Sequence, residues 1–284
     1  MMSDLTTDIL KGDHRALAKA ISIVEDRSNQ YQEIMKRIFP YTGGSLILGV
    51  TGAPGTGKST IIDRLIGDLR KEEKKIGVIA VDPSSPFTGG AVLGDRVRMM
   101  SHSVDREVFI RSMATRGNLG GLSESAGEVI ALMEAAGKDF ILLETVGVGQ
   151  DEVEVVKLAD IIIVVLMPGA GDEIQIYKAG IMEIADIFIL NKADSPEAVK
   201  TETQLKAMRE FAGKKTEIVK TIATEGKGIE ILFEKINECV HTRSETFSEI
   251  RKKRLISSML KEIIGEKLFR IIDKGITTAQ YEDM

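Results

Sequence analysis

The feature that constrains the fold most is the glycine-rich segment 52–60, which reads G-A-P-G-T-G-K-S-T and follows the apolar run 46–50. The apolar run predicts a buried strand, and Ile61, Ile62 and Leu65 predict a helix directly after the segment. A strand, a turn and a helix with the pattern G-x-x-x-x-G-K-[ST] form the loop that binds nucleotide phosphates. We therefore expect a fold built around this phosphate-binding loop (P-loop).

Each residue type in the P-loop has a physical function. Glycines permit backbone angles at which consecutive amides turn toward an anion at a helix N-terminus. Lys58 supplies a positive charge for the β- and γ-phosphates and is a candidate catalytic group, and the Ser59 hydroxyl is suited to bind Mg²⁺. The predicted phosphate-binding residues are Gly52, Ala53, Pro54, Gly55, Thr56, Gly57, Lys58, Ser59 and Thr60.

Further apolar runs, rich in β-branched residues, follow at helix-length intervals. They lie at 76–81, 108–110, 140–143, 161–166, 187–190 and 218–219. Such a pattern predicts an α/β fold of the P-loop NTPase type, with a mostly parallel sheet covered by helices on both faces. Ligands of such sheets bind at the carboxyl ends of the strands, so functional residues are expected directly after each run.

The two ends of the chain have a different character from its centre. We expect an N-terminal helical extension over residues 1–40, with two short helices within 12–39, and a P-loop domain over 41–240. Residues 241–284 form a predicted C-terminal helical tail, with an apolar stripe within 249–272 that includes Ile256. Such a stripe suits either packing within the chain or a dimer arm.

Composition limits the partners of the chain. Its net charge of −5 and pI near 5.5 argue against a nucleic-acid partner, because such a partner requires a basic face. The longest apolar run, 161–167, is far shorter than the ~20 residues that span a membrane. The single cysteine, Cys239, and an N-terminus without a secretory signal favour a cytoplasmic protein, or an organellar one whose presequence is absent.

Three acidic residues are candidates for the magnesium site and the switch regions. Asp82 ends the second strand, Asp95 lies in the glycine-rich segment after it, and Glu144 ends the fourth strand. Asp95 and Glu144 are also candidate catalytic residues, and Gly147 is placed to contact the γ-phosphate. Asp82 could instead cap a turn. Glu144 is one methylene longer than the more usual Asp, so its metal contact could be direct or mediated by water.

The sixth strand ends in Asn191-Lys192-Ala193-Asp194, a pattern that reads guanine. Guanine presents N1–H and a 2-amino group as paired donors, and the Asp194 carboxylate can accept both, with Lys192 along the base plane. Adenine would leave that carboxylate poorly paired, at a cost of about 1–3 kcal/mol. The loop of Ile222, Ala223 and Thr224 is expected to bring a backbone amide, that of Ala223, to guanine O6.

The order of these motifs resembles the MeaB/ArgK family of P-loop GTPases. The motifs that carry the resemblance are V-D-P-S-S-P (81–86), G-D-R-V-R-M (94–99), N-L-G-G-L (118–122), E-T-V-G-V-G-Q (144–150), P-G-A-G-D-E-I-Q (168–175) and N-K-A-D (191–194). The resemblance implies GTP/GDP and Mg²⁺ as ligands. It also implies a loop that senses the partner, containing Asp172, Gln175 and Lys178. Ile176 and Ala179 depart from the family pattern, which has Gly and usually Lys there.

The function implied by this resemblance is that of a GTP-hydrolysing chaperone. Such a protein binds a cobalamin-dependent acyl-CoA mutase of the methylmalonyl-CoA mutase type, gates the loading of adenosylcobalamin and protects the mutase. A homodimer is possible, although the C-terminal arm is shorter than is expected for the family. A small-molecule or transport-system kinase and a metal-insertion GTPase are the alternatives. The latter requires a His/Cys cluster, which the scattered His14, His102, His241 and Cys239 do not suggest.

Overall fold

The computed structural model describes most of the chain. The described residues are 4–82, 100–102, 104–114, 125–145, 158–169, 184–211 and 216–243, with isolated positions beyond them. They divide into two units, Met1–Ser244 and Glu245–Met284. The nucleotide-binding motifs lie in the first unit.

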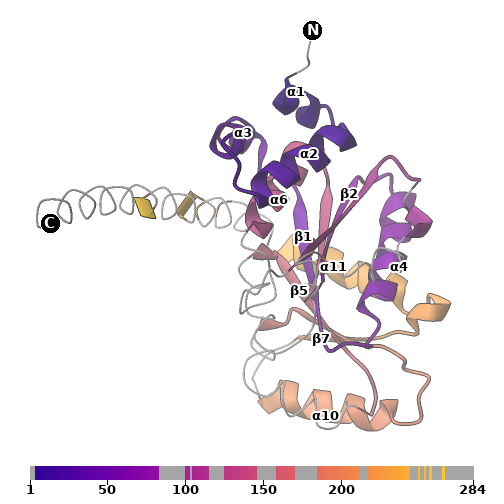
Figure 1. Cartoon of the computed structure of the whole chain (residues 1–284). Coiled ribbons are helices and arrows are strands. Elements are labelled where there is room, and N and C mark those ends of the chain that lie inside the picture. The colour runs from indigo at the N-terminus through magenta and orange to yellow at the C-terminus, as the bar shows by residue number, and fades with distance from the viewer. Residues whose placement is uncertain are drawn as a thin grey trace, which may run out of the picture. The chain divides into compact units, whose positions relative to one another are not determined.

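The first unit alternates strands and helices (Figure 1). Its strands are β1 Leu46–Thr51, β2 Ile76–Asp82, β3 Val108–Ala114, β4 Phe140–Glu144, β5 Ile161–Leu166, β6 Ile187–Leu190 and β7 Glu217–Lys220. Its α-helices are α1 Leu5–Leu10, α2 His14–Glu25, α3 Tyr31–Ile38, α4 Lys58–Lys71, α6 Ala126–Ala135, α10 Ala198–Phe211 and α11 Ile229–Arg243. Short 3₁₀ helices are η1 Phe39–Tyr41, η2 Met100–His102 and η4 Ala223–Glu225.

The seven strands form one sheet in the order β3-β2-β4-β1-β5-β6-β7, and every pair is parallel. The strand before the P-loop, β1, therefore lies between β4 and β5. In a parallel sheet all strands end at the same edge, so the loops after β1, β4 and β6 gather there. The predicted α/β fold with a parallel sheet is confirmed, and all seven predicted strands are present.

Helices pack on both faces of the sheet. Alternate strand residues such as Leu48 and Val50 join a buried cluster with Ile62 of α4 and Leu232 of α11. On the other face α6 approaches closely, since a Cβ at Gly77 of β2 would lie 2.7 Å from Met133 Sδ. The sheet is thus buried on both sides, which explains why its strands are continuous apolar runs.

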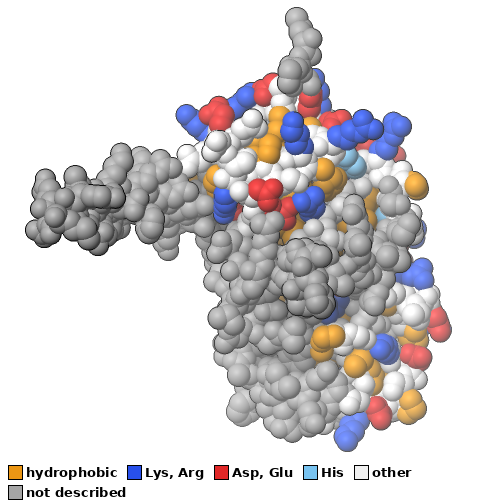
Figure 2. Space-filling view, in the orientation of Figure 1, with side chains coloured by type: hydrophobic (Ala, Val, Ile, Leu, Met, Phe, Trp, Pro, Cys, Tyr) orange, Lys and Arg blue, Asp and Glu red, His pale blue; other side chains and the backbone are white. Residues whose placement is uncertain are grey.

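The two helices that the sequence pattern predicts within residues 12–39 are present as α2 and α3, and a further helix, α1, precedes them. The additional helix, α1, has six residues and buries only Thr6 and Ile9, so it carries too short a pattern to be recognised. The extension packs on α6, where the buried Glu128 accepts hydrogen bonds of 3.2 Å from Arg27 and Tyr31. Figure 2 shows basic and acidic side chains interspersed over these helices.

The second unit is described at only a few positions. The backbone is helical at Glu249, Lys253, 256–257 and 264–265, and Ile256 of the predicted stripe is 40% exposed. The other residues of that stripe lie outside the described part, so the choice between internal packing and a dimer arm stays a prediction. Among the described residues, no helix combines the length and the apolar character needed to cross a membrane.

Candidate nucleotide-binding site

The P-loop joins β1 to α4 through three glycines in left-handed or related conformations. Gly52, Gly55 and Gly57 have φ angles of 143°, 79° and 96°, which other residues rarely adopt. A Cβ at Gly52 would lie 2.2 Å from the carbonyl oxygen of Val165. Gly57 is the N-cap of α4, and a Cβ there would lie 2.3 Å from Asn191 Nδ2. The sequence therefore needs glycine at 52 and 57 for space as well as for backbone angle.

Lys58 and Ser59, the first residues of α4, are buried at the strand edge. Lys58 Nζ donates to the carbonyl oxygens of Gly52 at 2.8 Å and Ala53 at 3.2 Å, so its ammonium group lies against the loop. Thr56 Oγ1 also donates to the Ala53 carbonyl at 2.8 Å. The loop is thus held in a closed turn by its own side chains, with a positive charge and a helix N-terminus beside it.

Glu144 lies beside the P-loop because β4 pairs with β1 in a register that places Glu144 opposite Val50. Ser59 Oγ donates to Glu144 Oε1 at 2.8 Å, and Glu144 is 2% exposed. A hydroxyl and a carboxylate within hydrogen-bond distance form the oxygen donor set that Mg²⁺ prefers, together with phosphate oxygens and water. The chemistry of these two side chains therefore fits a magnesium ion.

Asn191 connects the P-loop to the base-recognition loops. Its Nδ2 donates to the Thr56 carbonyl at 2.8 Å, and its Oδ1 accepts from Thr221 Oγ1 at 3.0 Å and from the Ala223 amide at 3.1 Å. Asn191 is 3% exposed, so its donor and acceptor atoms are matched away from water. The segments that would hold the phosphates and the base are therefore fixed to one another.

Lys192 and Asp194 lie on the exposed side of the same motif. Lys192 has a φ of 56° and donates through Nζ to the Gly55 carbonyl at 2.9 Å. A left-handed lysine is uncommon and is held here by a side-chain contact to the P-loop. Asp194 stands two residues further along, where its carboxylate is accessible to a ligand.

The loop after β7 is folded back on itself by two glycines. Ile222 and Lys227 form an antiparallel bridge, Gly226 ends η4 with a φ of 74°, and a Cβ at Gly228 would lie 2.1 Å from the Lys220 carbonyl oxygen. The Ala223 amide donates to Asn191 Oδ1 at 3.1 Å, and its predicted contact with guanine O6 stays a prediction. The neighbouring Thr224 amide makes no hydrogen bond within the described part of the chain.

Several predicted site residues cannot be placed. Backbone structure is described for Asp82, the last residue of β2, but not its side chain. The predicted site residues outside the described part are Asp95, Gly147, Asp172, Gln175 and Lys178, and the two departures from the family pattern, Ile176 and Ala179, also lie there. Their predicted roles in magnesium binding, switching and partner sensing stay predictions.

The structure adds residues that the motifs do not reveal. Arg64 of α4 donates to the carbonyl oxygens of Ala223 and Thr224. Thr145 Oγ1 donates to Thr51 Oγ1 at 3.0 Å, which joins the ends of β4 and β1. No local pattern identifies these contacts, because each joins segments that are far apart in the sequence.

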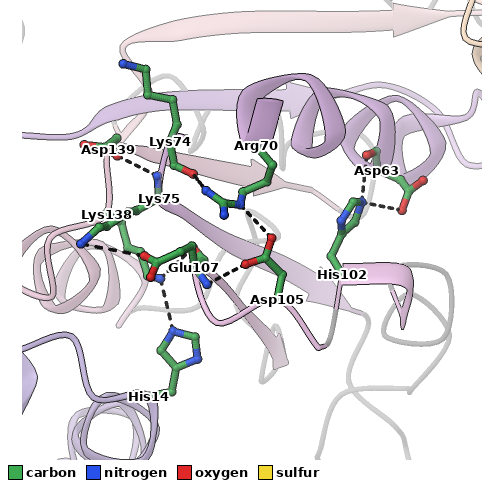
Figure 3. A network of polar contacts seen from close by, with 10 residues as sticks. All are labelled: His14, Asp63, Arg70, Lys74, Lys75, His102, Asp105, Glu107, Lys138 and Asp139. Atoms are coloured by element: carbon green, nitrogen blue, oxygen red, sulfur yellow. Dashed lines mark hydrogen bonds and ion pairs between the residues drawn. The ribbon is translucent and has the colours of Figure 1, made fainter. Parts of the chain in front are cut away.

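A second polar network lies at the opposite, amino-terminal edge of the sheet (Figure 3). Lys138 Nζ donates to the Glu107 carbonyl at 3.0 Å and lies 3.3 Å from His14 Nε2. Burial lowers the pKa of Lys138 to about 8. Burial, followed by the charge of Lys138, lowers the pKa of His14. Because this network is at the edge away from the P-loop, it is separate from the candidate site.

Among the described residues, no group of three or more His, Cys, Asp or Glu residues is arranged to hold a metal ion. Cys239 is partly buried against the core cluster.

Comparisons with known sequences agree with this geometry. The model of a family described as methylmalonyl Co-A mutase-associated GTPase MeaB matches residues 17–275. A Pyrococcus abyssi protein named "Putative GTPase" is 45% identical over 293 residues, covering 100% of this chain and 90% of the relative. The GTPase ArgK of Escherichia coli is 43% identical over 188 residues, covering 65% of this chain and 57% of ArgK. Methylmalonic aciduria type A homolog, mitochondrial, from Mus musculus is 34% identical over 259 residues, covering 84% and 62%.

Solved structures share the fold. The crystal structure of an LAO/AO transport system kinase superposes with a TM-score of 0.72 and 30% identity, covering 93% of this chain and 83% of that chain. The hydrogenase maturation factor HypB from Archaeoglobus fulgidus superposes with a TM-score of 0.53 and 20% identity, covering 74% and 98%. The second likeness concerns the fold alone.

Proposed function

The chain belongs to the family of the methylmalonyl Co-A mutase-associated GTPase MeaB and is a P-loop GTPase, and on this premise we propose that it is a chaperone of a cobalamin-dependent acyl-CoA mutase. In this proposal GTP hydrolysis times a conformational change that gates the loading of adenosylcobalamin and protects the mutase. We also propose a cytoplasmic location.

The observation that carries the nucleotide part of the proposal is the set of contacts made by Asn191. A single buried amide side chain joins the Thr56 carbonyl of the P-loop to the Ala223 amide of the base loop. A ligand that touches both segments must have a phosphate end and a base end a fixed distance apart. A guanine nucleotide has this form, and the exposed Asp194 supplies the carboxylate that pairs with N1–H and the 2-amino group of guanine.

Hydrolysis in such a site depends on positioning and charge. Lys58 is placed to stabilise the charge that develops between the β- and γ-phosphates, and the P-loop amides at the N-terminus of α4 act in the same direction. Ser59 and Glu144 would hold Mg²⁺, which supplies charge neutralisation on the phosphate oxygens. Asp82 and Asp95 are proposed to complete this region, and Gly147 to respond to the γ-phosphate.

Slow intrinsic turnover is expected until a partner completes the site, as is general for regulatory GTPases. The partner-sensing loop proposed here contains Asp172, Gln175 and Lys178. The test is GTP turnover by the full chain with and without a methylmalonyl-CoA mutase, together with complex formation measured by gel filtration. Stimulated turnover and a stable complex would support the proposal. The absence of both complex formation and stimulated turnover with mutases of this type would contradict it.

A small-molecule kinase is the second candidate, because the solved structure of the LAO/AO transport system kinase shares the fold at 30% identity. The two candidates differ in the fate of the γ-phosphate. A kinase transfers it to an acceptor, whereas a GTPase releases it as inorganic phosphate. Quantitative recovery of the γ-phosphate as inorganic phosphate would exclude the kinase. Accumulation of a phosphorylated acceptor would favour it.

A further inference from the structure

Arg64 lies in the second turn of α4 and reaches across to the loop that follows β7. Its Nε donates to the carbonyl oxygen of Ala223 at 3.0 Å, and its Nη2 donates to the carbonyl oxygen of Thr224 at 2.7 Å. A planar guanidinium group that binds two successive carbonyls fixes the orientation of the peptide units between them. Arg64 therefore holds backbone of the base loop from the helix that begins at the P-loop.

This contact determines where the amides of the loop point. The peptide bonds of the described chain include no cis bond, and in a trans peptide the C=O and N–H groups point in opposite directions. Because the Ala223 carbonyl is directed at Arg64, the Thr224 amide is directed away from it. The Ala223 amide donates to Asn191, and the Glu225 amide donates to the Ile222 carbonyl. The Thr224 amide is thus the donor of this loop that stays available to a ligand.

From this geometry we infer that Arg64 is a positioning residue for base specificity, and this inference rests on the proposed guanine site. Arg64 keeps the Ala223–Thr224 peptide in the orientation that offers an N–H group, which suits the O6 acceptor of guanine. A flip of the same peptide would offer the Ala223 carbonyl, which suits the 6-amino donor of adenine. Arg64 opposes that flip through its bond to the Ala223 carbonyl, which also accepts from the Gly226 amide at 3.2 Å, and so favours guanine over adenine.

The loop does not depend on Arg64 for its overall path. Gly226 and Gly228 have φ angles of 74° and 80° that turn the chain, and the Ile222–Lys227 bridge closes it. Arg64 itself is exposed, so its replacement leaves no cavity in the core. A substitution at this position is therefore expected to change the orientation of one peptide rather than the folding of the domain.

The test compares three diphosphates with the full chain in Mg²⁺ by calorimetry: GDP, 6-thio-GDP, whose sulfur is a poor acceptor at position 6, and IDP, which lacks the 2-amino group. We expect Arg64→Met to lower the affinity for GDP and for IDP by about tenfold, because one hydrogen bond to the base is lost. The affinity for 6-thio-GDP should fall by less than about twofold. The ratio of GDP to 6-thio-GDP affinity should therefore collapse, while the ratio of GDP to IDP stays constant. Arg64→Lys should give an intermediate ratio of GDP to 6-thio-GDP affinity, because a single ammonium group replaces the guanidinium group that binds two carbonyls.

Arg70→Met is the matched control, since Arg70 lies on the same helix but donates to Asp105 and to the Lys74 carbonyl. It should leave all three affinities unchanged. Equal weakening of all three diphosphates by Arg64→Met, or no weakening, would overturn the positioning role. A wild-type protein that binds ADP as tightly as GDP would instead overturn the guanine site itself, so the two failures are distinguishable.

Discussion

Asn191 Nδ2 donates a 2.8 Å hydrogen bond to the carbonyl oxygen of Thr56, a residue 135 positions earlier in the chain. The contact joins the end of β6 to the P-loop, and the other end of the same side chain binds the loop after β7. One amide side chain therefore joins the three segments that a guanine nucleotide would touch. Its loss should affect both the stability of the domain and nucleotide binding.

Asn191→Ala removes the partner of the Thr56 carbonyl, the Thr221 hydroxyl and the Ala223 amide. Each buried polar group without a partner costs about 1–3 kcal/mol, so we expect the free energy of unfolding to fall by about 3 kcal/mol, after partial relaxation. Urea denaturation measures this loss, and GDP affinity should fall with it. Asn191→Asp keeps an acceptor for Thr221 and Ala223 but replaces the donor to Thr56 with a carboxylate oxygen that repels the Thr56 carbonyl, so it should also lower the free energy of unfolding. Unchanged urea midpoints for both variants would show that the hydrogen bonds of Asn191 do not contribute to the free energy of unfolding.

Gly57→Ala tests whether the P-loop geometry needs glycine. The added Cβ would lie 2.3 Å from Asn191 Nδ2 at a residue with a φ of 96°, so we expect GDP affinity to fall by at least about tenfold through displacement of both segments. Gly67→Ala, in the interior of the same helix, has no atom within 4 Å of the new Cβ. It should raise the free energy of unfolding by about 0.5–1 kcal/mol without a change in affinity. Normal GDP binding by Gly57→Ala would contradict this reading of the loop.

Much of the fold could be predicted from the sequence, for a physical reason. Strands buried on both faces must be apolar along their length, so runs such as 161–166 mark them directly. The P-loop is equally predictable from the glycines at 52 and 57, because its backbone angles exclude other residues. The short helix α1 cannot be predicted in this way, since six residues with two buried side chains show no clear helical periodicity of apolar residues.

The site is predictable where its residues follow directly after strands of the sheet and not where a helix meets a distant loop. The pair of Ser59 and Glu144 follows because the P-loop and Glu144 come at the ends of the neighbouring strands β1 and β4. The contact of Arg64 with Ala223 depends on how α4 lies beside the last loop, which no local pattern specifies. For the same reason no local pattern predicts that the Ala223 amide donates to Asn191.

Glu144→Gln keeps an oxygen that can accept from Ser59 but removes the negative charge. If Glu144 supports Mg²⁺ directly or through water, the magnesium concentration needed for half-maximal GTP turnover should rise by about tenfold or more. GTP hydrolysis measured over a range of Mg²⁺ concentrations gives this value, and GDP binding without Mg²⁺ serves as the control for folding. The same magnesium dependence in the wild type and in Glu144→Gln would show that Glu144 does not take part in magnesium binding.

Lys138 predicts a pH dependence of stability at the other edge of the sheet. Its pKa is about 8 in the folded protein against 10.5 as the ordinary value, so the unfolded chain binds more protons between these pH values. The free energy of unfolding should therefore rise as the pH increases from about 8 to 10.5, by at most about 3 kcal/mol at 1.36 kcal/mol per pKa unit. Below pH 8 both states are protonated and the penalty is fully present.

The control for this prediction is Lys138→Met, which retains a long apolar stem and cannot titrate. The difference in unfolding free energy between the wild type and this variant, followed by denaturant titration at several pH values, isolates Lys138 from other groups that titrate at high pH. A constant difference from pH 7 to 10.5 would contradict the lowered pKa of Lys138.

The measurement that tests the central claim most directly is the calorimetric titration of the full chain with GTP and with ATP, each with Mg²⁺ present and absent. If the P-loop holds the phosphates and Asp194 reads the base, GTP with Mg²⁺ should bind at least about tenfold more tightly than ATP, since buried mismatches cost about 1–3 kcal/mol. Removal of Mg²⁺ should weaken GTP. Equal affinity for ATP and GTP, or no binding of either nucleotide in the presence of Mg²⁺, would contradict the account.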